Sequence, residues 1–267
     1  MPDLFIETRG HGDTHIVLLH GWAMTGSVFA PLAGQLESRC TLHLVDLPGH
    51  GRSRDCGLPL EPHACAAAIA AATPPALWLG WSLGGLIALT AALDLPHQAH
   101  GLAMLCATPK FVRDAGWPHG SDPALVQQLA SDLETDYHAT IERFLALEAM
   151  GSADPRGELR HLRELVFARG EPDARVLQEG IRILHDSDRR AALPDLAVPS
   201  AWIAGRRDRL VPPQAMTWSA SQCGGDSHEI AQAGHAPFFS HAAAVVAALQ
   251  PLFARHGGRA SASLAHE

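Results

Sequence analysis

The stretch Ala76-Leu77-Trp78-Leu79-Gly80-Trp81-Ser82-Leu83-Gly84-Gly85-Leu86-Ile87-Ala88 decides the fold of this chain. Its apolar start predicts a buried strand, the residues from Leu83 to Leu93 predict a helix, and Gly80–Gly84 between them matches G-x-S-x-G. So tight a strand–turn–helix connection forces Ser82 into a strained backbone conformation and lifts its Oγ clear of the sheet at a helix N-terminus. Ser82 is therefore the predicted nucleophile.

A serine hydroxyl is a weak nucleophile, and it needs a base and an acid that orients the base. For a serine on this kind of turn, the acid and then the histidine follow along the chain. His235, in a loop before the last helix, is the predicted base, and Asp208, in the loop after a strand, is the predicted acid. Asp186 and Asp188 compete with Asp208, but they lie too early, in a helical segment.

His20 is the main competitor of His235 among the 17 histidines. It directly follows an early strand and precedes Gly21-Trp22, which is the usual place for a loop that binds an oxyanion. We therefore expect the backbone N–H groups of Trp22 and Leu83 to form an oxyanion hole. The loss of one such donor typically costs about 3–4 kcal/mol of barrier stabilisation.

Outward from Ser82, short apolar runs bounded by Gly or Pro alternate with helical stretches. The runs predict buried strands, and runs that are apolar on both faces favour a mostly parallel sheet flanked by helices. The expected strands are Ile16–His20, Thr41–Val45, Ala76–Gly80, Leu102–Cys106, Ser200–Ala204 and a strand-like His228–Ala231. The expected helices of this α/β core include Phe29–Leu36, Leu83–Leu93 and Ala242–Ala254.

The middle of the chain has no convincing strand and shows amphipathic helix patterns instead. One stripe holds Leu125 and Leu133, another holds Ile141 and Phe144, and Leu162 belongs to a third. The sequence therefore predicts a core over residues 1–112 and 191–255 with an inserted all-helical cap over residues 113–190. Residues 256–267 are rich in Gly, Ala and Ser, and we expect a disordered tail there.

The composition excludes several classes of protein. The 267 residues carry a formal net charge of −8, which gives no global field for nucleic acid. Lys110 is the single lysine, so the remaining 19 of the 20 basic residues are arginine. The mean hydropathy of +0.02 is too low for a polytopic membrane protein, and Pro and Gly break the uncharged stretch 62–93 into pieces too short to span a bilayer.

The cysteines and the N-terminus predict the compartment. Five cysteines, an odd number without a C-x-x-C spacing, fit reduced thiols better than a disulfide framework. The first residues show no basic and apolar regions of a signal peptide. We therefore expect a cytoplasmic location.

These motifs together resemble the α/β-hydrolase superfamily and, more narrowly, the pimeloyl-[acyl-carrier-protein] methyl ester esterases of biotin synthesis. The resemblance runs from about Phe5 to Phe253, and Gly80–Gly85 combined with Glu142–Leu147 is its most specific part. Its other motifs are Leu19–Trp22, Thr41–Ser53, Asp208 with Leu210–Pro212, and His235–Phe238.

The resemblance implies a serine carboxylesterase that removes the methyl group from a carrier-bound pimeloyl methyl ester. It implies no cofactor, and the histidines show no metal-ligand spacing, so we expect no metal. It also implies a monomer that meets an acyl-carrier-protein-linked substrate. The acyl site would be lined by Trp22, Ser82, Leu83, Phe144, Leu145, Ala146, Leu147, Glu148 and His235, and Phe111 is a further candidate.

Arginines of the cap would meet the carrier protein, and Arg143, Arg156 and Arg160 are the implied contacts. Helix geometry places Arg156, Arg160 and Arg163 on one face, away from the leucine stripe. The plainer interpretation is a solvated face on which Glu158 and Glu164 pair locally with the arginines. The chain departs from the family pattern at Ala139, where a further arginine is usual, and at Glu148, where a neutral amide is expected.

Two other functions remain open at this point. The same triad would serve a broad-specificity short-chain carboxylesterase, because substrate choice depends on the cap. A non-catalytic binding protein on the same fold is less consistent with an intact Ser82, Asp208 and His235.

Overall fold

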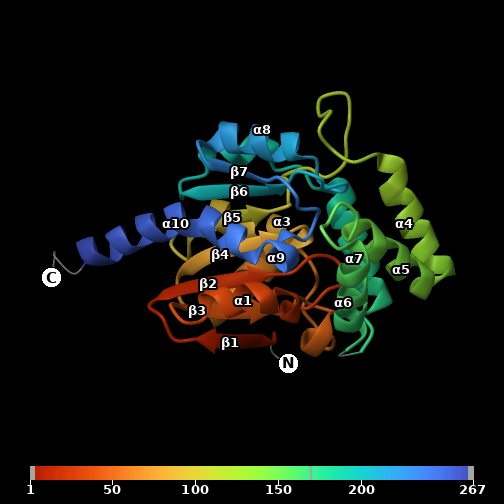
Figure 1. Ribbon diagram of the computed structural model, residues 1–267, viewed down its shortest axis with the longest axis horizontal. Coiled ribbons are helices and arrows are strands. Elements are labelled where there is room, and N and C mark those ends of the chain that lie inside the picture. Colours follow the sequence, from red (N-terminus) through yellow and green to blue (C-terminus); the bar gives the residue numbers. More distant parts are fainter. Residues whose placement is uncertain (1–3, 169, 264–267) are drawn as a thin grey trace.

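The computed structural model describes residues 4–168 and 170–263, and their centre is a seven-stranded sheet (Figure 1). The strand order is β1-β3-β2-β4-β5-β6-β7, and every pair is parallel except β1 with β3. The strands are β1 Ile6–Gly10, β2 Thr14–Leu19, β3 Cys40–Val45, β4 Ala76–Trp81, β5 Ala99–Leu105, β6 Ser200–Gly205 and β7 Asp226–Ile230. The predicted mostly parallel sheet is confirmed.

The edge strand β1 was absent from the sequence prediction. Its sequence Ile-Glu-Thr-Arg-Gly contains no apolar run, and most of its residues are only half-buried. It pairs antiparallel with β3, from Ile6 opposite Val45 to Gly10 opposite Thr41. Since an edge strand needs only one neighbour and buries little, its sequence carries a weak signal.

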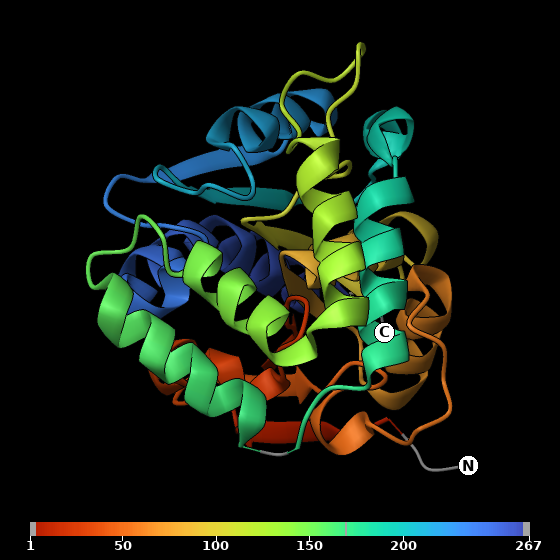
Figure 2. The ribbon, with the colours of Figure 1, turned by 90° about the vertical axis from the view of Figure 1, so that its right-hand side faces the viewer.

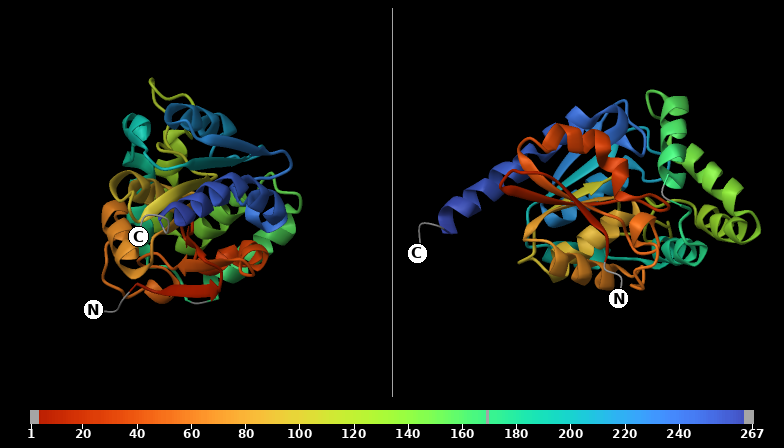
Figure 3. Two further views of the ribbon diagram at one scale, coloured as in Figure 1. Left: turned by 90° about the vertical axis from the view of Figure 1, so that its left-hand side faces the viewer. Right: turned by 90° about the horizontal axis from the view of Figure 1, so that it is seen from below.

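Helices cover both faces of the sheet (Figure 3). On one face α1 Ala30–Leu36 packs against α10 Ala242–Ser263, and on the other face α2 Pro62–Ala72 packs against α3 Leu83–Asp94. Helix α8 Pro213–Cys223 lies against β6 and β7. The expected tail begins inside the range assigned to α10, and its last four residues lie outside the described part of the chain.

Among the described residues between β5 and β6, the chain forms four α-helices and no strand of the sheet, and Figure 2 shows these helices packed together. They are α4 Pro123–Thr135, α5 Tyr137–Glu148, α6 Pro155–Phe167 and α7 Ala174–Asp186. Each begins after an aspartate whose carboxylate accepts a backbone N–H of the first turn, and these N-caps are Asp122, Asp136, Asp154 and Asp173. The boundaries of the cap at residues 113 and 190 stay a prediction.

None of the helices within the described residues is both long enough and apolar enough to cross a bilayer. All five cysteines are free thiols, and four of them are buried.

The glycines of the Ser82 turn allow strand β4 and helix α3 to approach closely. A Cβ on Gly80 would lie 2.3 Å from the Gly84 carbonyl oxygen, and a Cβ on Gly84 would lie 2.3 Å from the Leu19 carbonyl oxygen. Both neighbours are backbone atoms, which cannot turn away. Any side chain at these two positions would therefore push α3 off the sheet.

We expect Gly84→Ala to lower the free energy of unfolding by about 2 kcal/mol or more, because its methyl group meets the backbone of β2. The matched control is Gly34→Ala on α1, where a Cβ has open space and should stabilise by about 0.5–1 kcal/mol. Urea unfolding of both variants measures the difference. Equal effects of the two substitutions would contradict the packing argument.

Candidate active site

Ser82 occupies the strained turn that the sequence predicts. It has φ +53° and ψ −120°, and its side chain is almost wholly buried. Its backbone N–H donates to Leu105 at 3.2 Å, and its carbonyl accepts from Gly85 at 2.9 Å. The turn is thereby fixed both to the end of β5 and to the first turn of α3.

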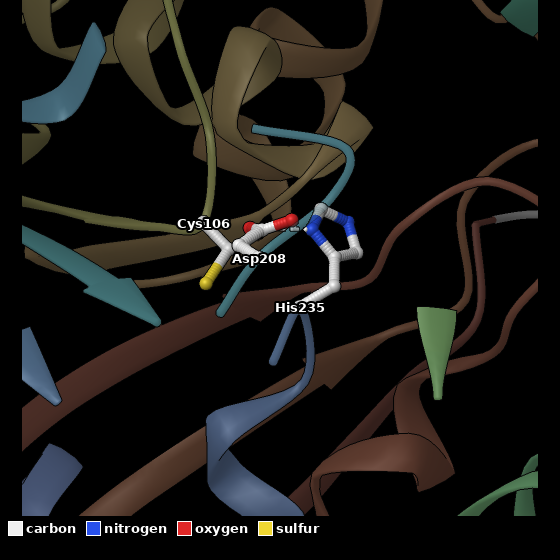
Figure 4. A group of neighbouring side chains, drawn as sticks. All are labelled: Cys106, Asp208 and His235. Atoms are coloured by element: carbon white, nitrogen blue, oxygen red, sulfur yellow. Dashed lines mark hydrogen bonds and ion pairs between the residues drawn. The ribbon is translucent and has the colours of Figure 1, made fainter. Parts of the chain in front are cut away.

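Asp208 and His235 form a buried pair (Figure 4). His235 Nδ1 lies 2.8 Å from Asp208 Oδ2, and both side chains are fully buried. The other carboxylate oxygen, Oδ1, accepts the backbone N–H groups of Leu210 at 2.8 Å and Val211 at 3.0 Å. Three donors converge on Asp208, so it is built to carry a negative charge and to hold the Nδ1–H tautomer of His235.

The remaining ring nitrogen, His235 Nε2, is buried and has no hydrogen-bond partner among the described residues. Trp81, the residue before Ser82, donates its indole N–H to the His235 carbonyl at 2.8 Å and packs against the imidazole at 5.6 Å between ring centroids. The histidine loop is thus attached to the serine turn, and Nε2 is left available as a base. Hydrogen bonds of this kind are often long or absent before substrate binds.

The Gly21-Trp22 loop lies beside Ser82. A Cβ on Gly21 would lie 3.2 Å from the Ser82 Cβ, so this loop runs directly past the nucleophile. Within the described residues the backbone N–H groups of Trp22 and Leu83 donate to no protein group. Two unused donors next to Ser82 are compatible with the predicted oxyanion hole, whose assignment stays a prediction.

His20, the competing histidine, serves the structure of this loop. Its Nδ1–H donates to the Gly21 carbonyl at 2.8 Å, and its Nε2 accepts the Leu47 backbone N–H at 2.9 Å. Burial lowers the pKa of His20 to about 4. Burial, with the neighbouring His20, lowers the pKa of His50 to about 3, and His50 Nδ1–H donates to the Pro48 carbonyl. Both rings are therefore neutral supports of the fold.

Cap residues reach the site mainly through Trp22. Its indole N–H donates to the Leu177 carbonyl of α7 at 2.9 Å, and its ring meets Phe144 of α5 edge-on at 4.7 Å. A Cβ on Gly180 would lie 2.7 Å from the Trp22 ring, so α7 needs a glycine there. Of the other predicted acyl-site residues, Phe111, Leu145 and Glu148 are buried, whereas Ala146 and Leu147 are exposed.

The exposed face of α6 carries the predicted arginines. Arg156 and Arg160 are exposed and form no ion pair within the described residues. Arg163 pairs with Glu142, and Arg143 pairs with Asp132 at 2.8 Å. The free guanidinium groups of Arg156 and Arg160 are therefore available to an external anion.

The expectation that Glu158 pairs locally with these arginines is wrong. Glu158 is 7% exposed and lies on the buried face of α6 with Leu162 and Val166. The spacing i, i+4, i+8 places it on that stripe, and this signal was available in the sequence. Leu125, predicted in an apolar stripe, is 62% exposed, whereas Leu133 of the same helix is 4% exposed.

Cys106 is a further neighbour of the pair that the sequence prediction missed (Figure 4). One potential ligand atom from each of Cys106, Asp208 and His235 lies within 4.8 Å of the others. The Nδ1 atom of His235 and the Oδ2 atom of Asp208 are already hydrogen-bonded to each other, and Oδ1 of Asp208 accepts two backbone N–H groups. Burial and the nearby Asp208 raise the pKa of the Cys106 thiol, which disfavours the thiolate that a metal needs. This cluster therefore gives no ground for a metal site.

The two buried histidines make stability depend on pH. A pKa lowered in the folded state means that folding releases protons, so stability is present above about pH 6.5 and is lost as the pH falls toward 4. We expect His50→Asn, which keeps a donor for the Pro48 carbonyl, to reduce this slope by at most about 1.4 kcal/mol per pH unit. Urea unfolding between pH 4 and pH 7 measures it. The exposed His11→Asn is the control, and equal slopes in the two variants would refute the argument.

Comparisons with known proteins agree with this geometry. A family model described as the alpha/beta hydrolase family matches residues 16–249. The pimeloyl-[acyl-carrier protein] methyl ester esterase of Stenotrophomonas maltophilia is 55% identical over 248 residues, which cover 92% of this chain and 95% of the relative. Its namesake from Xylella fastidiosa is 50% identical over 254 residues, which cover 94% of this chain and 99% of the relative.

A solved esterase from Exiguobacterium antarcticum superposes with a TM-score of 0.82 over 94% of this chain and 100% of its own, at 20% sequence identity. This likeness concerns the fold. The family match and the two sequence relatives go further, since they span nearly the whole chain. The chain therefore belongs to the alpha/beta hydrolase family and, within it, to the family of the pimeloyl-[acyl-carrier protein] methyl ester esterases.

Proposed function

We propose that this chain is a serine carboxylesterase that hydrolyses the methyl ester of pimeloyl-[acyl-carrier protein] methyl ester in biotin biosynthesis. The products are pimeloyl-[acyl-carrier protein] and methanol. The observation that carries the proposal is the buried Asp208–His235 pair with an unpartnered Nε2, attached through Trp81 to the Ser82 turn. The names of relatives that match over more than nine-tenths of the chain support the choice of substrate.

The reaction proceeds in two halves at Ser82. In the first half His235 Nε2 takes the hydroxyl proton while Oγ attacks the ester carbonyl, and the N–H groups of Trp22 and Leu83 bind the oxyanion. His235 then protonates the departing methoxide, so methanol leaves and an acyl-serine remains. In the second half His235 activates a water molecule, which releases the free carboxylate and restores Ser82. Asp208 stabilises the imidazolium in both halves.

The substrate has a second reactive bond, the thioester at the carrier end, and this bond must survive. An apolar channel between cap and core would place only the methyl end at Ser82. Phe144 packs on Trp22 beside the nucleophile, which supports a role at the acyl chain. Phe111 is buried nearer the start of the cap and Leu147 is exposed, so they suit the inner wall and the mouth of such a channel.

The carrier protein is acidic, and the net charge of −8 on this chain repels it. Local cations must therefore provide the attraction. Arg156 and Arg160 suit this role because their planar guanidinium groups are exposed and form no ion pair with any described residue. Arg143, which already pairs with Asp132, would have to exchange that partner.

We expect Ser82→Ala to lower kcat for methanol release from the carrier-bound methyl ester by about 10⁴-fold or more, and Asp208→Asn by about 10⁴-fold.

The same prediction can be tested in cells and by labelling. Wild type should restore growth of a biotin-requiring strain that lacks this esterase, and Ser82→Ala should not. A fluorophosphonate should label the wild type but not Ser82→Ala. Rescue by both forms or by neither would refute the proposal. Faster turnover of a short soluble ester than of the carrier-bound ester would favour a broad-specificity carboxylesterase.

We expect Arg156→Glu and Arg160→Glu each to lower kcat/KM for the carrier-bound ester by about fivefold or more at low salt, with a smaller effect at high salt. A small soluble ester should be hydrolysed at the wild-type rate by both variants. The matched control is Arg39→Glu, the same charge reversal on an exposed residue just before β3, at the opposite edge of the parallel strands. An equal loss in the control, or an equal loss with the small ester, would contradict a carrier contact at α6.

A further inference from the structure

Two glutamates of the cap are buried without a counter-charge. Glu148, the last residue of α5, is fully buried, and neither of its carboxylate oxygens has a hydrogen-bond partner among the described residues. Glu158, in the first turn of α6, is 7% exposed, and its Oε1 also has no partner. No arginine, lysine or histidine of the described chain pairs with either residue. An isolated carboxylate in such surroundings is very costly, so the neutral acid is favoured.

These glutamates lie next to the catalytic loops. The turn between α5 and α6 packs on the loop of His235, since a Cβ on Gly234 would lie 2.6 Å from the Met150 carbonyl oxygen and 3.0 Å from the Ser152 nitrogen. A Cβ on Gly151 would lie 2.5 Å from the Arg207 carbonyl oxygen, one residue before Asp208. The turn that joins the two acids of the cap therefore packs directly on the loops of His235 and Asp208.

The groups around the two acids leave no cation for them. From the core, Asp208 is negative, Cys106 is a neutral buried thiol, and His235 is bonded to Asp208. From the cap, the Ser152 hydroxyl adjoins Glu158, and Asp154 caps α6 through the Gly157 N–H. The side chain of Arg207 is exposed and forms no ion pair within the described residues.

The available hydrogen-bond donors decide which acid is ionised. Asp208 receives three, from Leu210, Val211 and His235, whereas none reaches Glu148. Burial, with Glu158 and Asp208 nearby, raises the pKa of Glu148 well above its usual range. Burial raises the pKa of Glu158 to about 8, which Ser152 opposes and Asp154 reinforces.

We propose that Glu148 and Glu158 are positioning residues that act as neutral carboxylic acids behind the Asp208–His235 pair, so that Asp208 is the one ionised carboxyl at this end of the imidazole. This inference rests on the proposed function for the roles of Asp208 and His235. The proposal implies that Asp208 is the one ionised carboxyl at this place only below the pH at which Glu158 loses its proton. When Glu158 loses its proton, a negative charge arises near Glu148, which itself lies near Asp208, and the field at the Asp208–His235 pair changes.

Infrared spectroscopy of the whole protein tests the protonation directly, because the C=O stretch of a carboxylic acid is separate from the bands of a carboxylate. At pH 7 we expect acid bands that diminish in Glu148→Gln and in Glu158→Gln and are unchanged in Glu164→Gln, an exposed residue of the same helix. The Glu158 band should disappear as the pH rises through about 8. Absence of any acid band in the wild type at pH 7 would overturn the proposal without reference to a variant.

A second measurement separates a positioning role from a merely structural one. In the NMR titration of the wild type, the His235 Nδ1–H resonance should show an inflection near pH 8 that Glu158→Gln lacks and Glu164→Gln retains. If acid bands are present but the His235 resonance is identical in all three proteins, the positioning role is refuted. Neither measurement involves substrate, so failure of the proposed esterase activity would appear separately, in the Ser82→Ala experiments.

Discussion

The backbone conformation of Ser82 is the constraint on which the rest of the site depends. A non-glycine residue at φ +53° and ψ −120° stores strain, of order 1–3 kcal/mol, and the surrounding packing must hold it there. Gly80 and Gly84 make that possible because backbone atoms occupy the space of a side chain at both positions. The same turn connects β4 to its neighbours, since the Ser82 N–H donates to the end of β5 and Trp81 holds the His235 loop. A local turn thereby fixes where distant loops meet.

The sequence could predict those parts of the molecule whose signals are local. Apolar runs between glycines and prolines identified five of the strands, and the loop positions of Asp208 and His235 placed them at the same edge of a parallel sheet. Strand β1 could not be predicted from the sequence, because it has no apolar run. Glu158 carries two opposing signals, because a glutamate is usually exposed whereas its helical position lies on the buried stripe of Leu162. The pairing of Arg143 with Asp132 depends on how α5 meets α4, which no local pattern encodes.

Trp22 is one of the residues through which the cap contacts the surroundings of the nucleophile. Trp22 belongs to the loop of the predicted oxyanion hole, yet its indole N–H is bonded to α7 and its ring makes a T-shaped contact with Phe144 of α5. A movement of either helix must therefore shift the backbone whose N–H group would bind the oxyanion. The predicted oxyanion hole and the proposed substrate selection by the cap would therefore both depend on Trp22.

Helix α6 shows how a chain of net charge −8 can still serve an acidic partner. Its outer face presents Arg156 and Arg160 without counter-ions, while its inner face buries Glu158 beside Leu162. An ionised Glu158 would weaken the field of the two arginines and would place a negative charge near Glu148, which itself lies near Asp208. A neutral Glu158 has neither effect, because a protonated carboxyl carries no net charge. Glu148 fits the same logic, since a protonated carboxyl has the shape and neutrality of the amide expected at that position. The charge that helix α6 presents therefore depends on whether Glu158 is protonated, and the number of acidic and basic residues does not determine it alone.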